Sequence, residues 1–196
     1  MAVPTHPARP TRAGARGVLR DDAHAAEPTV EETRQHLAYR YTLAALRLSL
    51  GWVFLWAFVD KLLGLGRATP ADGAWIDGGS PTAGFLGNAP TGPFAPAFTA
   101  IAGAGWADWL FMAALLGIGS ALVLGIGMRV AAVSGSALLV LMWAAVLPPA
   151  NNPVVDDHLV YALVLVLLAL TSAGRTLGLG RRWEELPLVT RYGALR

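Results

Sequence analysis

Two uncharged stretches decide the fold class: WLFMAALLGIGSALVLGIGM at residues 109–128 and, after one arginine, VAAVSGSALLVLMWAAVLPPANNPVV at residues 130–155. At about 1.5 Å per helical residue, each is long enough to cross about 30 Å of hydrocarbon. The whole chain agrees, because 55% of its 196 residues are hydrophobic and only 14% are charged, against about a quarter in soluble domains. The sequence therefore predicts an all-α integral membrane protein.

Apolar segments on either side complete a predicted bundle of four transmembrane helices. We expect helices at about 43–63, 106–124, 129–147 and 156–173, within a membrane domain over 39–183. Residues 64–105 contain five prolines and ten glycines, a composition that excludes a spanning helix and predicts a long loop folded back on the bundle. The polar residues 1–38 predict a disordered arm, and 184–196 form a short tail.

The distribution of arginine predicts how the chain is oriented. Arginines are concentrated in the amino-terminal arm, in the short loop at Arg129 and in the tail after the fourth helix, whereas the long loop contains only Arg67. The positive-inside rule then places both termini in the cytoplasm and the long loop on the outer side of the inner, cytoplasmic membrane. This bias explains the formal net charge of +2, so no nucleic-acid partner is expected.

The absence of cysteine restricts the chemistry. Disulfides, thiolate zinc sites, iron–sulfur clusters and covalent haem attachment all require a sulfur that the 196 residues lack. His158 is the one histidine near a membrane segment, so a monomer cannot hold a bis-histidine haem. No metal site is singled out, and any redox chemistry is expected to use a diffusible cofactor or a partner's redox centre.

Polar residues from every predicted helix fall at the outer end of the bundle. Ionisable groups at membrane depth are costly and tend to face a cavity or a partner, so we take His158, Asp157 and Asp108 as candidate catalytic residues. Candidate substrate contacts at this end are Lys61, Arg67, Trp106 and Tyr161. The structural alternatives stay open: Asp156 can cap the fourth helix, tryptophans can form an aromatic belt, and Lys61 can extend to the headgroups.

The first helix carries three further candidates. Arg47 lies about one turn inside its cytoplasmic end and either extends to the membrane surface or contacts an anion or a quinone carbonyl. Trp52 and Trp56, with Phe58, could line an apolar quinone cleft or simply face lipid. In the second helix, small residues recur every fourth position, which predicts a packing seam at Ala113, Gly117, Ala121 and Gly125.

Four stretches resemble the DoxX/DoxD family of small four-helix membrane proteins. They are LRLSLGWVFLWAFVDKL at 46–62, WIDGGSPTAGFL at 75–86, ADWLFMAALLGIGSALVLGIGMRVAA at 107–132, and the region 141–183, in which NNPVVDDHLVYAL is the most specific piece. The resemblance to the DoxD type implies a subunit of a thiosulfate:quinone oxidoreductase. It would oxidise a sulfur anion at the outer face to tetrathionate, pass two electrons to quinone and usually pair with a smaller subunit.

These observations leave three functional hypotheses. The first is a membrane oxidoreductase subunit that passes electrons to diffusible quinone, with a partner subunit or a second copy of the chain. The excess of acids over cations at the outer end counts against a tight thiosulfate site in this chain alone. The second hypothesis is a non-catalytic accessory or scaffold subunit of a larger respiratory or redox complex. The third, a small-solute carrier, lacks the inverted repeat typical of such proteins.

Overall fold

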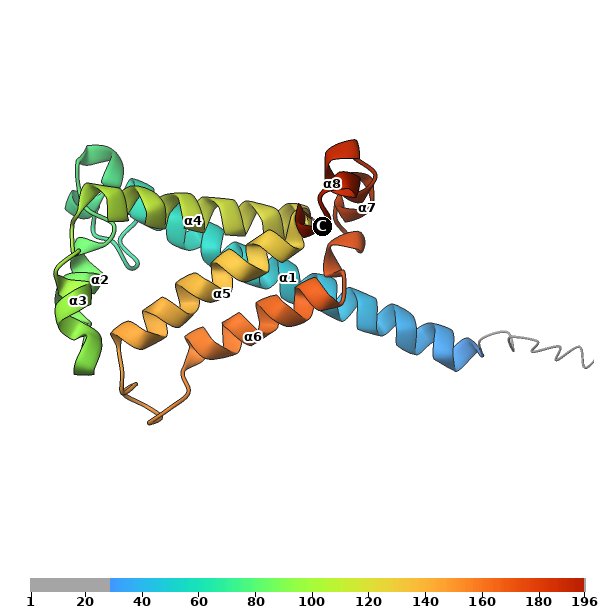
Figure 1. Cartoon of the computed structure of the whole chain (residues 1–196), viewed down its shortest axis with the longest axis horizontal. Coiled ribbons are helices and arrows are strands. Elements are labelled where there is room, and N and C mark those ends of the chain that lie inside the picture. Colours follow the sequence, from blue (N-terminus) through green and yellow to red (C-terminus); the bar gives the residue numbers. More distant parts are fainter. Residues whose placement is uncertain (1–28, 196) are drawn as a thin grey trace, which may run out of the picture.

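The computed structural model describes residues 29–195, which form helices and turns (Figure 1). The helices are α1 (Val30–Leu63), α2 (Ala83–Asn88), α3 (Ala95–Thr99), α4 (Gly105–Leu124), α5 (Met128–Ala145), α6 (Asp157–Leu170), α7 (Gly180–Glu184) and α8 (Pro187–Arg191), with 3-10 turns at Ala71–Gly73, Trp75–Asp77, Gly92–Phe94, Ala173–Arg175 and Gly193–Leu195. Three of them, α1, α4 and α5, are long and apolar enough to cross a membrane. The apolar α6 has 14 residues, which span only about 21 Å.

Helix α1 begins earlier than the sequence analysis predicts. It starts at Val30 rather than at about 43, so residues 30–38 are helical and do not belong to a disordered arm. A capping box fixes this start: the Glu32 N–H donates to Thr29 Oγ1 (3.2 Å), and the Thr29 N–H donates to Glu32 Oε2 (2.7 Å). The rest of the predicted arm, residues 1–28, lies outside the described residues.

The long helices form two pairs. Helix α1 packs along α4 and α5 packs along α6, with α4 also contacting α5 (Figure 1). The buried core between them is aliphatic and aromatic, and its larger side chains are Leu50, Phe54, Met112, Leu115, Ile118, Leu122, Leu139, Leu165 and Leu168. Many apolar side chains on the opposite faces are exposed, among them Trp52, Leu110, Val133 and Leu163. An exposed apolar surface of this kind is what lipid covers in a membrane.

Close contact between α1 and α4 depends on two glycines. A Cβ at Gly119 would lie 2.7 Å from Leu55 Cγ, and a Cβ at Gly51 would lie 2.9 Å from Val123 Cγ2. The predicted seam is therefore displaced, because Ala113 and Gly117 are exposed and a Cβ at Gly117 would meet nothing within 4 Å. Of the four predicted positions, Gly125 is the one that is buried, and a Cβ there would lie 2.7 Å from the carbonyl oxygen of Gly174 rather than against α1.

The segment between α1 and α4 is folded, as the sequence predicts, and is tied down at both of its sides. At one side it follows Leu63 through Gly64, whose φ of 61° suits glycine. At the other side Thr91 donates from its N–H to the carbonyl of Ala145 (2.8 Å) and from Oγ1 to the carbonyl of Leu147 (3.0 Å). The segment thus bridges from the α1–α4 pair to the carboxyl end of α5.

The carboxyl-terminal segment folds against the opposite end of the helices. Leu179 donates its N–H to the carbonyl of Leu124 (2.8 Å), and Arg129 Nη1 donates to the carbonyl of Gly193 (2.8 Å). The predicted tail is therefore ordered up to Leu195 and covers the end of α4 and the start of α5 (Figure 1).

Candidate functional site

The end of the helices that carries the segment 64–104 is called the loop end here, and the opposite end, with Arg47 and Arg129, the arginine end. All the residues that the sequence assigns to catalysis lie at the loop end. They do not form one cluster, because the two helix pairs diverge toward this end (Figure 1). Asp108 lies at the start of α4, whereas Asp157 and His158 lie at the start of α6.

His158 forms the centre of the α6 group. Its Nδ1 lies 2.7 Å from Asp156 Oδ2 and 3.7 Å from Asp157 Oδ1. The side chains of His158 and Asp156 are 21% and 13% exposed, and that of Asp157 is 72% exposed. The His158–Asp156 pair is therefore largely shielded, with the imidazole held by one carboxylate. This arrangement leaves Nε2 as the ring atom that can exchange a proton with another molecule.

Asp156 has two roles, and the sequence analysis anticipates only one. It caps α6, as expected, because Oδ1 accepts the N–H of Leu159 (3.2 Å). Its φ of −124° and ψ of −177° are extended, so the side chain turns back over the first turn and Oδ2 reaches His158. A residue two positions away is out of reach inside a helix, but it is accessible from the cap position. The Asp-x-His spacing at a predicted helix start is the sequence feature that could have indicated the contact between Asp156 and His158.

The same three residues offer ligand atoms to a cation. One oxygen or nitrogen from each of Asp156, Asp157 and His158 lies within 4.8 Å of the others. Imidazole and carboxylate are common ligands of divalent ions. The exposure of Asp157 leaves this group open to solvent on one side.

Asp108 has a structural set of partners. Its Oδ1 accepts hydrogen bonds from Ser80 Oγ (2.9 Å), the Thr82 N–H (3.0 Å) and Thr82 Oγ1 (2.6 Å). The residue is buried, and Thr82 Oγ1 in turn accepts the N–H of Gly103 (3.2 Å). The carboxylate thus fixes both ends of the stretch 80–103 against the start of α4. We assign Asp108 to holding this segment rather than to proton transfer.

Replacing Asp108 by alanine is expected to loosen the segment 78–104. The Thr82 N–H would then be buried without an acceptor, which costs about 1–3 kcal/mol. Hydrogen–deuterium exchange in this segment should accelerate about tenfold or more, while exchange in α5 stays unchanged. The matched control is Asp77→Ala, because Asp77 is an exposed acid of the same segment. Equal exchange in both variants would contradict this assignment.

Lys61 and Arg67, the anion contacts predicted at this end, differ in their environments. The neighbouring Asp60 is buried and accepts the backbone N–H groups of Arg67 (3.3 Å) and Ala68 (3.0 Å). Lys61 Nζ lies 5.9 Å from the ring centroid of Phe111, a cation–π distance. Arg67 is exposed. Both cations belong to the α1–α4 pair, so they do not supplement the His158 group on α6.

Both terminal nitrogens of the buried Arg47 guanidinium are bound by the chain's own backbone, while Nε is buried without a hydrogen-bond partner among the described residues. Nη1 donates to the carbonyls of Leu122 and Val123, the latter at 2.9 Å, and Nη2 donates to those of Thr176 (3.2 Å) and Leu177 (2.9 Å). Because four carbonyls occupy both terminal nitrogens, the predicted contact with an anion or a quinone is not available in this structure. Arg47 instead joins α1 to the end of α4 and to the segment after α6.

The aromatic candidates lie mostly on exposed faces. The rings of Trp52 and Trp56 lie 5.9 Å apart, tilted by 36°, on the outside of α1, with exposed fractions of 62% and 37%. This position suits contact with lipid rather than the predicted quinone cleft. Trp106 is exposed as well. Tyr161 is half-buried against the core near His158, where the sequence analysis places it.

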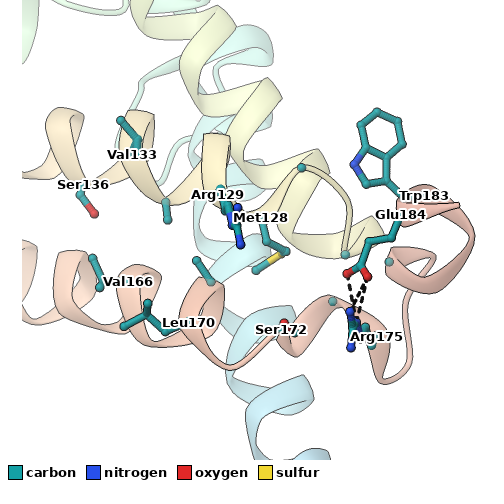
Figure 2. A pocket seen from close by; sticks show the side chains of 16 residues that line it. Met128, Arg129, Val133, Ser136, Val166, Leu170, Ser172, Arg175, Trp183 and Glu184 are labelled. Carbon is teal, nitrogen blue, oxygen red and sulfur yellow. Dashed lines mark hydrogen bonds and ion pairs between the residues drawn. The ribbon is translucent and has the colours of Figure 1, made fainter. Parts of the chain in front are cut away.

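The sequence analysis did not anticipate a cavity of about 690 Å³ at the arginine end, between α5 and α6 (Figure 2). Val133 and Ser136 line it from α5, and Val166 and Leu170 line it from α6. At its mouth Arg175 binds Glu184 through Nε (3.0 Å) and Nη2 (2.5 Å). These hydrogen bonds, with the attraction between the two charges, raise the pKa of Arg175 above its ordinary value.

Comparison of the chain with protein-family models, with curated proteins and with solved structures gives no match. The described residues offer places for a ligand at both ends of the helices, with the His158–Asp156 pair at the loop end and cavity space at the arginine end.

Proposed function

We propose that the chain is a DoxX/DoxD-like subunit of a membrane oxidoreductase, in which the His158–Asp156 pair exchanges protons with membrane quinone at the loop end. The observation that carries the proposal is the 2.7 Å contact between His158 Nδ1 and Asp156 Oδ2. A carboxylate that orients an imidazole in this way is typical of residues that transfer protons. Tyr161 and Asp157 lie on the same helix and complete the polar group.

The membrane topology of the proposal has four spans. Helices α1, α4 and α5 are long enough by themselves, and α6 pairs with α5 over its whole apolar length, so we place it in the membrane too. By the positive-inside rule, the arginines at the end opposite the loop support both termini in the cytoplasm and the chain in the inner membrane. The loop end then faces outward, and the short α6 brings His158 toward the membrane interior from that side.

The proposed reaction is balanced by two half-reactions. Two thiosulfate dianions join through a new sulfur–sulfur bond to give tetrathionate and release two electrons, and quinone takes up two electrons and two protons to become quinol. His158 would deliver one of these protons through Nε2. Because Asp60, Asp108, Asp156 and Asp157 outnumber the cations at the loop end, we place the sulfur-anion site mainly on a partner subunit or a second copy of the chain.

Replacing His158 by glutamine, or Asp156 by asparagine, is expected to slow thiosulfate-dependent quinone reduction about 100-fold, the usual contribution of a proton-transferring side chain. Asparagine still caps α6, so Asp156→Asn removes the carboxylate while it preserves the helix start. The assay uses the full chain in mild detergent with whatever subunit co-purifies. Asp72→Asn, an exposed acid of the loop, is the control and should keep full activity.

Rates that stay unchanged in both variants, with normal circular dichroism, would overturn the assignment of the pair.

A second candidate function, a non-catalytic scaffold subunit, is favoured by one observation: the buried Arg47, Asp60 and Asp108 all bind the chain's own groups. That function predicts no turnover by the preparation, together with a partner in constant stoichiometry.

A further inference from the structure

A second cavity at the arginine end is lined by several cationic side chains. It has a volume of about 280 Å³ and lies between the first turns of α1 and the segment that follows α6. Arg40, Arg175, Arg181 and His36 line it, and no acidic side chain is among its lining residues in the described part of the chain. Of these cations, Arg175 is already bound to Glu184, which lines the larger cavity. The hydroxyl groups of Ser172 and Thr176 are further donors in its wall. Such a concentration of donors and positive charge fits a phosphate group.

The level of this cavity coincides with the ends of the apolar helices. Arg40 precedes the buried Arg47 by seven residues of α1, or about 10 Å, and Arg47 binds the carbonyls at the end of α4. The segment that supplies the opposite wall starts directly after α6 ends at Leu170. Tyr39, which lines the cavity, and Tyr41, at nearly the same level of α1, are exposed, as aromatic side chains often are at a membrane surface. In a membrane that covers the apolar helices, this is the level expected for lipid phosphates.

The cationic cavity adjoins the larger cavity between α5 and α6. Ser172 and Arg175 line both of them. Charged Arg129 and Glu184 also line the larger cavity. Farther along α5 and α6 its walls are mainly apolar, with Val133, Val166 and Leu170 (Figure 2). A cationic site continuous with an apolar groove matches a molecule that has a phosphate at one end and a hydrocarbon chain at the other.

We infer that the two cavities together bind one anionic phospholipid, with its phosphate between Arg40 and Arg181 and one acyl chain along the groove between α5 and α6. Basic pockets at helix ends are the usual places where membrane proteins hold acidic lipid headgroups. Free phosphate shares the headgroup chemistry, but it would leave the adjoining apolar groove without a role. The inference needs only that the chain lies in a membrane, and it is independent of the proposed redox function.

The test is native mass spectrometry of the full chain in mild detergent, titrated with phosphatidylglycerol, with phosphatidylcholine and with inorganic phosphate. Two variants probe the site, Arg181→Gln and the double variant Arg40→Gln/Arg181→Gln. The single variant keeps the hydrogen bond from Arg40 Nε to Thr176 Oγ1 (3.2 Å), so it disturbs the fold least. The matched control is Arg34→Gln/Arg182→Gln, which removes the same number of charges from two exposed arginines that line neither cavity.

We expect phosphatidylglycerol to bind more tightly than phosphatidylcholine. The double variant should bind phosphatidylglycerol about tenfold or more weakly than the control, because two charged hydrogen bonds to phosphate are lost. The single variant should show an intermediate loss. Equal weakening in the double variant and the control would mean that general charge attracts the lipid, and it would overturn the site. Inorganic phosphate that binds as tightly as phosphatidylglycerol would overturn the lipid as the occupant.

Discussion

Replacing Arg47 by methionine is expected to destabilise the protein by about 3 kcal/mol or more. Methionine fills much of the same volume but donates no hydrogen bond, so the carbonyls of Leu122, Val123, Thr176 and Leu177 would lose their common donor. Each buried polar group left unsatisfied costs about 1–3 kcal/mol. Two of these carbonyls belong to the last turn of α4, where the helix dipole also favours a cation. Unfolding of the purified protein in a denaturing detergent, followed by circular dichroism, measures the effect.

The conservative variant Arg47→Lys separates charge from geometry. An ammonium group keeps the positive charge but cannot present a planar fork to two pairs of carbonyls, so most of the stability should still be lost. The control is Arg182→Met, because Arg182 is exposed and its replacement should shift the free energy of unfolding by less than about 0.5 kcal/mol. Wild-type stability in Arg47→Met would show that the four carbonyls do not depend on this side chain.

Sequence reasoning marks Arg47 as anomalous but cannot supply its partners. Hydropathy shows that a charge lies within an apolar segment, which demands a partner of some kind. The carbonyls that satisfy it come from residues 75 to 130 positions away. Backbone carbonyls leave no trace in the sequence, because every residue has one. The long-range fold alone therefore decides between a ligand contact and a structural one.

The apolar helices are the part of the fold that the sequence predicts best. The predicted bounds 106–124 and 129–147 differ from α4 (Gly105–Leu124) and α5 (Met128–Ala145) by at most two residues. The start of α1 was missed by about a dozen residues because a polar helical extension carries no hydropathy signal. The capping-box pattern of Thr29 and Glu32 was the local sequence feature that indicated this helix start. The fourth helix is shorter than predicted mainly at its carboxyl end, because it ends at Leu170 and Ser172 adopts a φ of 51° before the 3-10 turn Ala173–Arg175.

The candidate site was predicted in part. His158, Asp157 and Tyr161 share one helix, so helical periodicity brings them together in the sequence already. Asp108 was grouped with them because it lies at the same end of a predicted bundle. In the structure the two helix pairs are apart at that end, and the Asp108 carboxylate accepts hydrogen bonds from Ser80 and Thr82. The sequence indicates at which depth in the membrane a residue of a predicted helix lies. The distance between residues on two different helices depends on how the helices pack, which the sequence does not show.

Two glycines of α4 offer the sharpest test of that packing. Gly119→Leu is expected to destabilise the protein by about 3 kcal/mol, at the upper end of the usual cost of overpacking. A side chain there would meet Leu55, whose backbone nitrogen lies 2.9 Å from the added Cβ, so a rotamer change cannot relieve the clash. The two helices would have to separate along the face that buries Phe54 and Leu115. Unfolding in a denaturing detergent again provides the measurement.

Gly117→Leu is the matched control, because it lies two residues away on the same helix but meets nothing within 4 Å. Leucine also has a better helix propensity than glycine, so this variant should be neutral or slightly more stable. If Gly117→Leu proved as damaging as Gly119→Leu, then the exposed face of Ala113 and Gly117 would be packed against another helix. The packing face assigned to α4 would then be incomplete, and the small-residue seam that the sequence predicts would lie between subunits rather than within one chain.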